Sequence, residues 1–158
     1  MNEFEKLLIP FENEVVNVLK FYNSNSYSPY SNFKVSSCLV IRKQDKIHYV
    51  GGSNVENSSY GLSICAERNA VFKSISEGLA PRDNEVSWLF IALFVPVKNF
   101  VSPCGACRQV ISEFIEDIPI VIYNQQFQKK IVLLNDIFKE KFSPKDLKKN
   151  KKIKWKGQ

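Results

Sequence analysis

Three cysteines and one glutamate have the side-chain types and the spacing of a metal-dependent active site. Cys65 and Glu67 lie two positions apart in "CAER", and Cys104 and Cys107 form a C-x-x-C pair in "SPCGACRQ". Thiolates bind zinc, and a catalytic zinc keeps three protein ligands and an open fourth position for water. A carboxylate beside such a site can carry protons without binding the metal. These four residues are therefore candidates for a catalytic zinc centre with its proton carrier.

The C-x-x-C pair alone has other interpretations: a redox dithiol, half of a structural zinc site, or coincidence. A thioredoxin-like pair would follow an early strand, whereas this pair lies about two-thirds of the way along the chain. A structural zinc site normally uses four protein ligands, and the single histidine, His48, lies in the strand-like stretch "DKIHYV". Cys38 lies in the apolar stretch "KVSSCLVI" and is expected to be buried as a small hydrophobe.

Zinc normally lowers the pKa of its bound water toward about 7. Three thiolates carry more negative charge than a divalent ion carries positive charge, and this excess should weaken the effect of zinc on that pKa. Two features can offset this. Cys65 and Cys104 stand where helices are expected to begin, so that positive helix dipole ends face the sulfurs. Arg68 beside Cys65, and Arg108 beside Cys107, can donate hydrogen bonds to sulfur. For Arg68 we favour this role over a surface ion pair.

The hydrophobic pattern predicts helices and strands that alternate along the chain. Helices are expected at about 11–22, 65–77, 104–116 and 135–139, and strands at about 34–42, 46–50, 87–95, 119–123 and 127–133. Gly78 should end the second helix. The stretch 87–95 is continuously apolar, as in a strand that is buried on both faces. The alternation implies a sheet with helices packed on both of its faces.

With 158 residues, of which 44% are hydrophobic, the chain is long enough for one folded domain. Its net charge of +6 is concentrated in residues 145–158, which hold seven lysines and one aspartate. We therefore predict a domain over 1–147 and a basic, mobile tail over 148–158, with polyanion binding by the tail as the less favoured alternative.

No apolar run approaches the about 20 residues of a membrane helix, and the acidic N-terminus, broken by Pro10, does not resemble a secretion signal. Neither a membrane nor a nucleic acid is expected as a partner, and we expect a cytoplasmic location.

The sequence resembles the small homotetrameric cytidine deaminases that use zinc with three cysteine ligands. "CAE" followed by "PCGACRQ" is the cysteine form of the zinc deaminase signature. The stretches "YSPYSNFKV", "GSNVENSSYGLSICAERNAVFKSISEG", "SPCGACRQVISEF" and a degenerate "FSPKDL" extend the likeness over roughly 12–147. The resemblance implies an α/β fold, a three-layer α/β/α sandwich with a mixed five-stranded sheet. It also implies hydrolytic deamination of cytidine and 2′-deoxycytidine to the uridine forms and ammonia, a reaction of pyrimidine salvage in which zinc-bound hydroxide attacks C4.

The resemblance further implies a role for each residue that matches the motifs. The zinc ligands would be Cys65, Cys104 and Cys107, and the general acid/base would be Glu67. Among the substrate-binding residues, Asn54 and Glu56 would bind the ribose hydroxyls, Phe33 would lie near sugar and base, and the backbone around Ala66 would meet the pyrimidine edge. Tyr60 and Phe142 would reach the site of a neighbouring subunit. From the residues alone, without the zinc motif, a polar turn is the favoured interpretation of "NVEN", and core positions are favoured over ligand contacts for Phe33 and Phe142.

Two other classes of function stay open. A related deaminase could act on deoxycytidylate, on an aminoglycosyl-pyrimidine antibiotic or on a base in nucleic acid; Cys65 in place of histidine and the "NVEN" stretch favour a free nucleoside. A non-enzymatic zinc or redox protein could use the same cysteines, but neither role needs the carboxylate of Glu67. The sequence does not distinguish a preference for cytidine from one for deoxycytidine.

Overall fold

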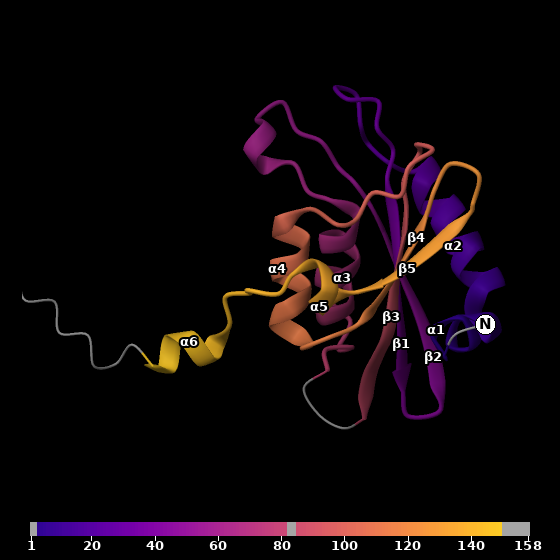
Figure 1. Cartoon of the computed structure of the whole chain (residues 1–158). Coiled ribbons are helices and arrows are strands. Elements are labelled where there is room, and N and C mark those ends of the chain that lie inside the picture. Colours follow the sequence, from indigo (N-terminus) through magenta and orange to yellow (C-terminus); the bar gives the residue numbers. More distant parts are fainter. Residues whose placement is uncertain (1–2, 82–84, 150–158) are drawn as a thin grey trace, which may run out of the picture.

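The structure is a computed structural model that describes residues 3–81 and 85–149 (Figure 1). One sheet holds five strands in the order β2-β1-β3-β4-β5. The strands are β1 (Ser36–Lys43), β2 (Lys46–Ser53), β3 (Val86–Phe94), β4 (Pro119–Tyr123) and β5 (Lys129–Leu133). Only the β3–β4 pair is parallel, and the other three pairs are antiparallel. The predicted mixed five-stranded sheet and α/β fold are confirmed.

Helices cover both faces of this sheet, which gives the three predicted layers (Figure 1). The helices are α1 (Glu3–Leu8), α2 (Glu12–Ser24), α3 (Ala66–Ser76), α4 (Gly105–Phe114), α5 (Leu134–Ile137) and α6 (Pro144–Lys149), with short 3₁₀ turns at Ile9–Phe11 and Tyr60–Leu62. Helices α1 and α2 lie on one face, and α3, α4 and α5 lie on the other. In the part of the chain that the structure describes, none of the helices combines the length and the apolar character of a membrane span.

Strand β1 shows why the sheet has an apolar core on each face. Side chains alternate between the two faces of a strand, so Leu39 and Ile41 join the core beneath α3 and α4, whereas Cys38 and Val40 join the core beneath α1 and α2. Cys38 has no exposed surface, as predicted. Its burial, together with the nearby charge of Glu14, raises the pKa of the thiol to about 12.

Helix α3 lies unusually close to strand β2 because Gly52 has no side chain. A Cβ atom at Gly52 would lie 2.5 Å from the carbonyl oxygen of Ala66 and 2.6 Å from the amide nitrogen of Ala70. The other end of α3 is closed by Gly78, whose φ of 74° suits glycine and whose N–H donates to Ile75 O at 3.1 Å. The predicted end of this helix is therefore confirmed.

Helices α1 and α6 were not expected from the sequence. Ser143 directly precedes α6, and its N–H and its hydroxyl donate to Asp146 Oδ2 at 2.9 and 2.8 Å; the bond from the N–H is one half of a capping box. The predicted domain boundary at residue 147 falls inside α6, which projects from the body (Figure 1). Residues 150–158 of the predicted tail lie outside the described residues, and the mobile tail stays a prediction.

Candidate active site

The reactive cysteines lie at the N-termini of two neighbouring helices. Cys65 is the N-cap residue of α3 and Cys104 is the N-cap residue of α4, both with extended backbone. Cys107 lies three residues further, in the first turn of α4, and is buried. An N-cap residue and the residue three positions later point to the same end of a helix. The two helix starts therefore bring three sulfurs together, as the predicted helix positions required.

The distances between these sulfurs fit a tetrahedral zinc ion. The Sγ atoms of Cys65 and Cys104 are 3.7 Å apart, those of Cys104 and Cys107 are 3.5 Å apart, and all three lie within 4.8 Å of one another. Two zinc–sulfur bonds of about 2.3 Å at a tetrahedral angle separate their sulfurs by about 3.8 Å. The donor set and its spacing thus match a three-thiolate zinc site.

Hydrogen bonds make the three thiols electrically unequal. The hydrogen bond from Cys107, followed by those from Arg68 and Cys104, lowers the pKa of Cys65 to about 5 against the opposing effect of its partial burial. The pKa of Cys107 is raised because its thiol donates to Cys65 and is buried near Glu67. A bound divalent ion replaces such shared protons, since metal ligands must be deprotonated.

Arg68 contacts the sulfur that was predicted for it. Its Nη2 atom lies 3.6 Å from Cys65 Sγ and also donates to Ser63 O at 3.4 Å. The guanidinium therefore places a positive charge beside the sulfur of Cys65. Its effect on the reactivity of zinc stays a prediction.

The same expectation for Arg108 is wrong, because its side chain turns toward oxygen atoms. Its Nε atom donates to Pro103 O at 2.7 Å, its Nη1 to Ile137 O at 2.8 Å, and its Nη2 to Ser102 Oγ at 3.0 Å. Arg108 directly follows Cys107 on α4, so its side chain points away from the helix in a different direction from that of Cys107. It ties the segment before α4 to α5 instead of donating to sulfur.

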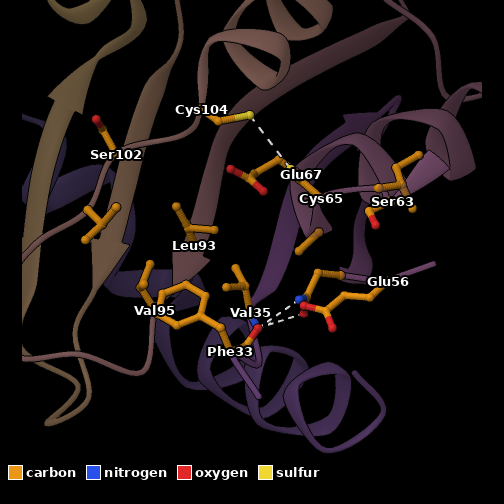
Figure 2. Close-up of a pocket in the computed structure, with 14 residues that line it drawn as sticks. Phe33, Val35, Glu56, Ser63, Cys65, Glu67, Leu93, Val95, Ser102 and Cys104 are labelled. Carbon is orange, nitrogen blue, oxygen red and sulfur yellow. Dashed lines mark hydrogen bonds between the residues drawn. The ribbon is translucent and has the colours of Figure 1, made fainter. Parts of the chain in front are cut away.

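Glu67 lies in the first turn of α3 and is only 4% exposed. Burial raises the pKa of its carboxyl to about 7, and the negative charge of Cys65 acts in the same direction. Figure 2 shows Glu67 beside Cys65 and Cys104 at one end of a cavity, with Phe33 and Glu56 at the other end. The carboxylate is thus placed to exchange protons with a molecule bound at the cysteines.

The cavity has a volume of about 300 Å³, which suits a small ligand. Its walls are mostly apolar, and several of their residues were not predicted from the sequence. These are Val35, Ser63, Ile64, Leu93, Val95, Val101 and Ser102. Leu93 lies at the carboxyl end of β3, which pairs in parallel with β4, and Val95 directly follows this strand. Ligands commonly bind outside the carboxyl ends of parallel strands, and this was the signal that could have found them.

Asn54, at the other end of the cavity, braces the segment before β1. Its Oδ1 atom accepts hydrogen bonds from Ser26 Oγ at 2.5 Å and Val35 N at 2.9 Å, and its Nδ2 donates to Phe33 O at 2.8 Å. Phe33 itself lines the cavity. The predicted ligand contacts of both residues remain to be tested.

Glu56 lines the same end of the cavity. Its Oε2 atom accepts from Tyr30 N at 2.9 Å and from Ser31 N at 3.2 Å, and its Oε1 accepts from the hydroxyl of Ser31. The hydrogen bond from the Ser31 side chain is the main cause that holds the pKa of Glu56 below its usual range. The carboxylate is therefore ionised at neutral pH and can only accept hydrogen bonds.

The remaining predicted residues divide into one inside the cavity and two outside it. Ala66 is fully buried and lines the cavity at the first position of α3. Tyr60 is 74% exposed and packs edge-on against Tyr30, with ring centroids 5.8 Å apart. Phe142 is 58% exposed, and its carbonyl accepts from Gln109 Nε2 at 2.8 Å. Neither ring lines the cavity of its own chain, and their predicted reach into a neighbouring subunit stays a prediction.

The part of the chain that holds the cysteine cluster matches a known protein family. The family model described as "Cytidine and deoxycytidylate deaminase zinc-binding region" matches residues 12–124, a span that contains all three clustered cysteines. This chain belongs to the cytidine and deoxycytidylate deaminase family. The cofactor of this deaminase is Zn²⁺, and the cysteine cluster offers three thiol groups that could hold it. The predicted three-cysteine, zinc-dependent deaminase is thereby confirmed.

The deaminase is similar to curated and solved members of the family. It is 37% identical over 123 residues to a cytidine deaminase of Halalkalibacterium halodurans, a match that covers 77% of this chain and 86% of the relative. It is 45% identical over 95 residues to a probable cytidine deaminase of Dictyostelium discoideum, with 58% of each chain covered. The crystal structure of cytidine deaminase from Burkholderia pseudomallei superimposes with a TM-score of 0.71 at 35% identity, over 82% of this chain and 98% of that one.

Proposed function

We propose that this deaminase hydrolyses cytidine and 2′-deoxycytidine to uridine and 2′-deoxyuridine with release of ammonia, as in pyrimidine salvage. One observation carries the proposal: buried Glu67 lies beside the three clustered sulfurs at one end of a cavity whose other end holds Asn54 and Glu56. The relatives named cytidine deaminase support the choice of substrate.

Cys65, Cys104 and Cys107 would hold the zinc ion through their sulfurs. When bound there, zinc supplies a Lewis acid that acidifies water for attack on C4 of the pyrimidine ring. Arg68 donates to Cys65 Sγ and so lowers the negative charge that the thiolates accumulate. The two helix N-termini act in the same direction, because Cys65 and Cys104 are their N-cap residues.

Glu67 moves the protons of the reaction. Its carboxylate would take a proton from the attacking water, deliver it to N3 of the ring and later help to protonate the departing amine. Such a group must lie within hydrogen-bond reach of both water and ring, and Glu67 lines the cavity between the cysteines and the substrate space. Its burial excludes bulk water from this exchange.

The rest of the cavity would hold the ring and the sugar. The backbone of Ala66 faces the cavity at the start of α3, where amide groups are free of helical partners and can meet the pyrimidine edge. Phe33 would pack beside sugar and base, while Asn54 and Glu56 would bind ribose hydroxyls. A site that hydrogen-bonds a hydroxyl rejects analogues without it strongly.

The charges of the cavity favour a nucleoside over a nucleotide or a nucleic acid. Among the described residues that line it there is no lysine, arginine or histidine, whereas Glu56 contributes a negative charge at the sugar end. A phosphate on the sugar would meet repulsion there instead of the cations that commonly bind it. This supports a free nucleoside over deoxycytidylate.

We further propose that the deaminase works as a homotetramer in which Tyr60 and Phe142 reach a neighbouring active site. Both side chains are exposed and lie outside the cavity of their own chain. A partner surface would cover apolar area that is exposed in the single chain. The cytoplasmic location stays a prediction.

The decisive experiment measures zinc per chain together with ammonia release from four substrates. Cytidine and 2′-deoxycytidine should be hydrolysed by protein that carries about one zinc per chain. Deoxycytidylate and a cytosine-containing oligonucleotide should have a kcat/KM at least about 100-fold lower, because the site must reject a charged group. Protein stripped of zinc by a chelator is the control. Faster turnover of deoxycytidylate than of cytidine would contradict the proposal.

A further inference from the structure

The hydroxyl group of Ser31 connects Glu56 and Phe33 at the end of the cavity where the sugar is proposed to bind. That hydroxyl donates to Glu56 Oε1 and accepts a hydrogen bond from Phe33 N at 3.0 Å. The backbone N–H of Ser31 also donates to Glu56, through Oε2 at 3.2 Å. Glu56 and Phe33 both line the cavity, whereas Ser31 lines an adjoining surface pocket that it shares with Glu56.

We propose that Ser31 is a positioning residue for substrate binding, which holds the carboxylate of Glu56 and the backbone of Phe33 as one unit. The inference rests on the proposed function, in which these two residues contact the nucleoside. It adds a residue that acts through them without touching the substrate itself.

The hydrogen-bonding capacity of a serine hydroxyl supports this indirect role. The group has a single proton to donate, and in the structure this proton is directed to Glu56. One of its lone pairs accepts from Phe33 N. The carboxylate has about four acceptor sites, so three donors from Tyr30 and Ser31 leave capacity for a ligand hydroxyl.

The backbone around Phe33 shows why its position depends on Ser31. Asn32 has a φ of 59°, a left-handed conformation that turns the chain between Ser31 and Phe33. After this turn, the N–H of Phe33 is held by Ser31 and its carbonyl by Asn54 Nδ2. Loss of the Ser31 hydroxyl would release the first of these bonds together with one hydrogen bond to Glu56.

The test compares Ser31→Ala with Ser31→Thr, which keeps a hydroxyl. Ser31→Ala should raise the KM for cytidine about tenfold and leave kcat within about twofold, because it weakens a charge-assisted hydrogen bond behind the binding residue and not a catalytic group. Ser31→Thr should restore the KM to within about threefold of wild type. Ser76→Ala is the matched control, since Ser76 is exposed on α3 and bonds only Phe72 O of its own helix.

A second measurement separates positioning from a general structural role. In a Glu56→Ala background, which removes the acceptor of the Ser31 hydroxyl, Ser31→Ala should raise the KM by clearly less than it does in the wild-type background, because only the hydrogen bond from Phe33 N is left to lose. Equal effects in both backgrounds would overturn the inference, and so would a fall in kcat at unchanged KM. Loss of zinc or of the folded circular dichroism spectrum in Ser31→Ala would make Ser31 a structural residue and overturn it as well.

Failure of the proposed function is distinguishable from failure of this inference. A wild-type protein that carries zinc but does not deaminate cytidine contradicts the proposed function. In that case amide hydrogen exchange of Phe33 decides the inference without turnover: its protection should fall about tenfold in Ser31→Ala, as expected for loss of one hydrogen bond. Unchanged protection would show that the hydroxyl does not hold Phe33.

Discussion

At one end of the cavity, the cysteines and Glu67 lie at the starts of α3 and α4 (Figure 2). At the other end, the lining side chains come from the segments 26–35 and 54–56, which have little regular structure. Glu67 is buried and Cys65 is partly covered, while Phe33 is 38% exposed. The first end is positioned by helices packed on the sheet. The second is positioned by hydrogen bonds between side chains and backbone.

This difference separates chemistry from recognition in the proposed reaction. Groups on packed helices keep a fixed geometry, which a metal and a proton carrier require. Groups on a hydrogen-bonded segment can be changed with little effect on the core. Substitutions at the helix end should therefore lower kcat, and substitutions at the segment end should raise KM.

The largest effect should follow substitution of Glu67. Glu67→Gln should lower kcat for cytidine by at least about 10³-fold, since it removes the proton carrier, while zinc content and the affinity for cytidine are kept. Kinetics, metal analysis and calorimetric titration with cytidine measure the three quantities. Glu113→Gln, on the exposed face of α4, is the control. Substantial turnover by Glu67→Gln would show that another group moves the protons.

Substitution of Arg68 should have an intermediate effect. Arg68→Gln keeps the fold but removes the positive charge that lies 3.6 Å from Cys65 Sγ, and kcat should fall by about 10- to 100-fold, as for other residues that orient metal ligands. Arg42→Gln on the exposed surface of β1 is the matched control. A change confined to KM would place Arg68 with the recognition residues and break the division.

Substitution of Asn54 should have the smallest effect and should act on binding. Asn54→Ala removes hydrogen bonds to Ser26, Val35 and Phe33; KM for cytidine should rise about tenfold with kcat within about threefold. Steady-state kinetics and zinc analysis test this. Asn57→Ala is the control, because Asn57 is exposed and bonds only neighbours in its own segment. Loss of zinc from Asn54→Ala would show that the two ends are not independent.

The helix end was the more predictable from sequence, for a physical reason. An N-cap cysteine and another three residues later share one helix end by local geometry alone, so the pair Cys104 and Cys107 could be read from its spacing. The approach of Cys65 to Cys104, 39 positions apart, followed from the chemical need for a third ligand. Glu67 could be predicted because neither a redox dithiol nor a structural zinc site needs a carboxylate beside the cysteines.

The parts that sequence reasoning missed depend on tertiary contacts. Arg108 was expected to donate to sulfur, but its direction is decided by the carbonyls of Pro103 and Ile137, from segments whose approach no local pattern shows. The bonds of Ser31 were missed for the same reason, since they depend on where the segment 54–56 passes. Helices α1 and α6 have only six residues each, which is too short for a helical repeat of apolar residues to be evident.

Gly52 also affects the geometry of the cysteine end of the cavity, through its contact with α3. Any side chain at Gly52 would push α3 away from β2, because its Cβ would meet backbone atoms at Ala66 and Ala70. Cys104 and Cys107 lie at the start of another helix, α4, so a shift of α3 would change their distances from Cys65. The distance between the sulfurs of Cys65 and Cys104 therefore depends on Gly52, which lies on the edge strand β2 and contacts neither sulfur. A substitution there should therefore lower metal affinity and displace the carboxylate of Glu67 together, because Cys65 and Glu67 both lie at the start of α3.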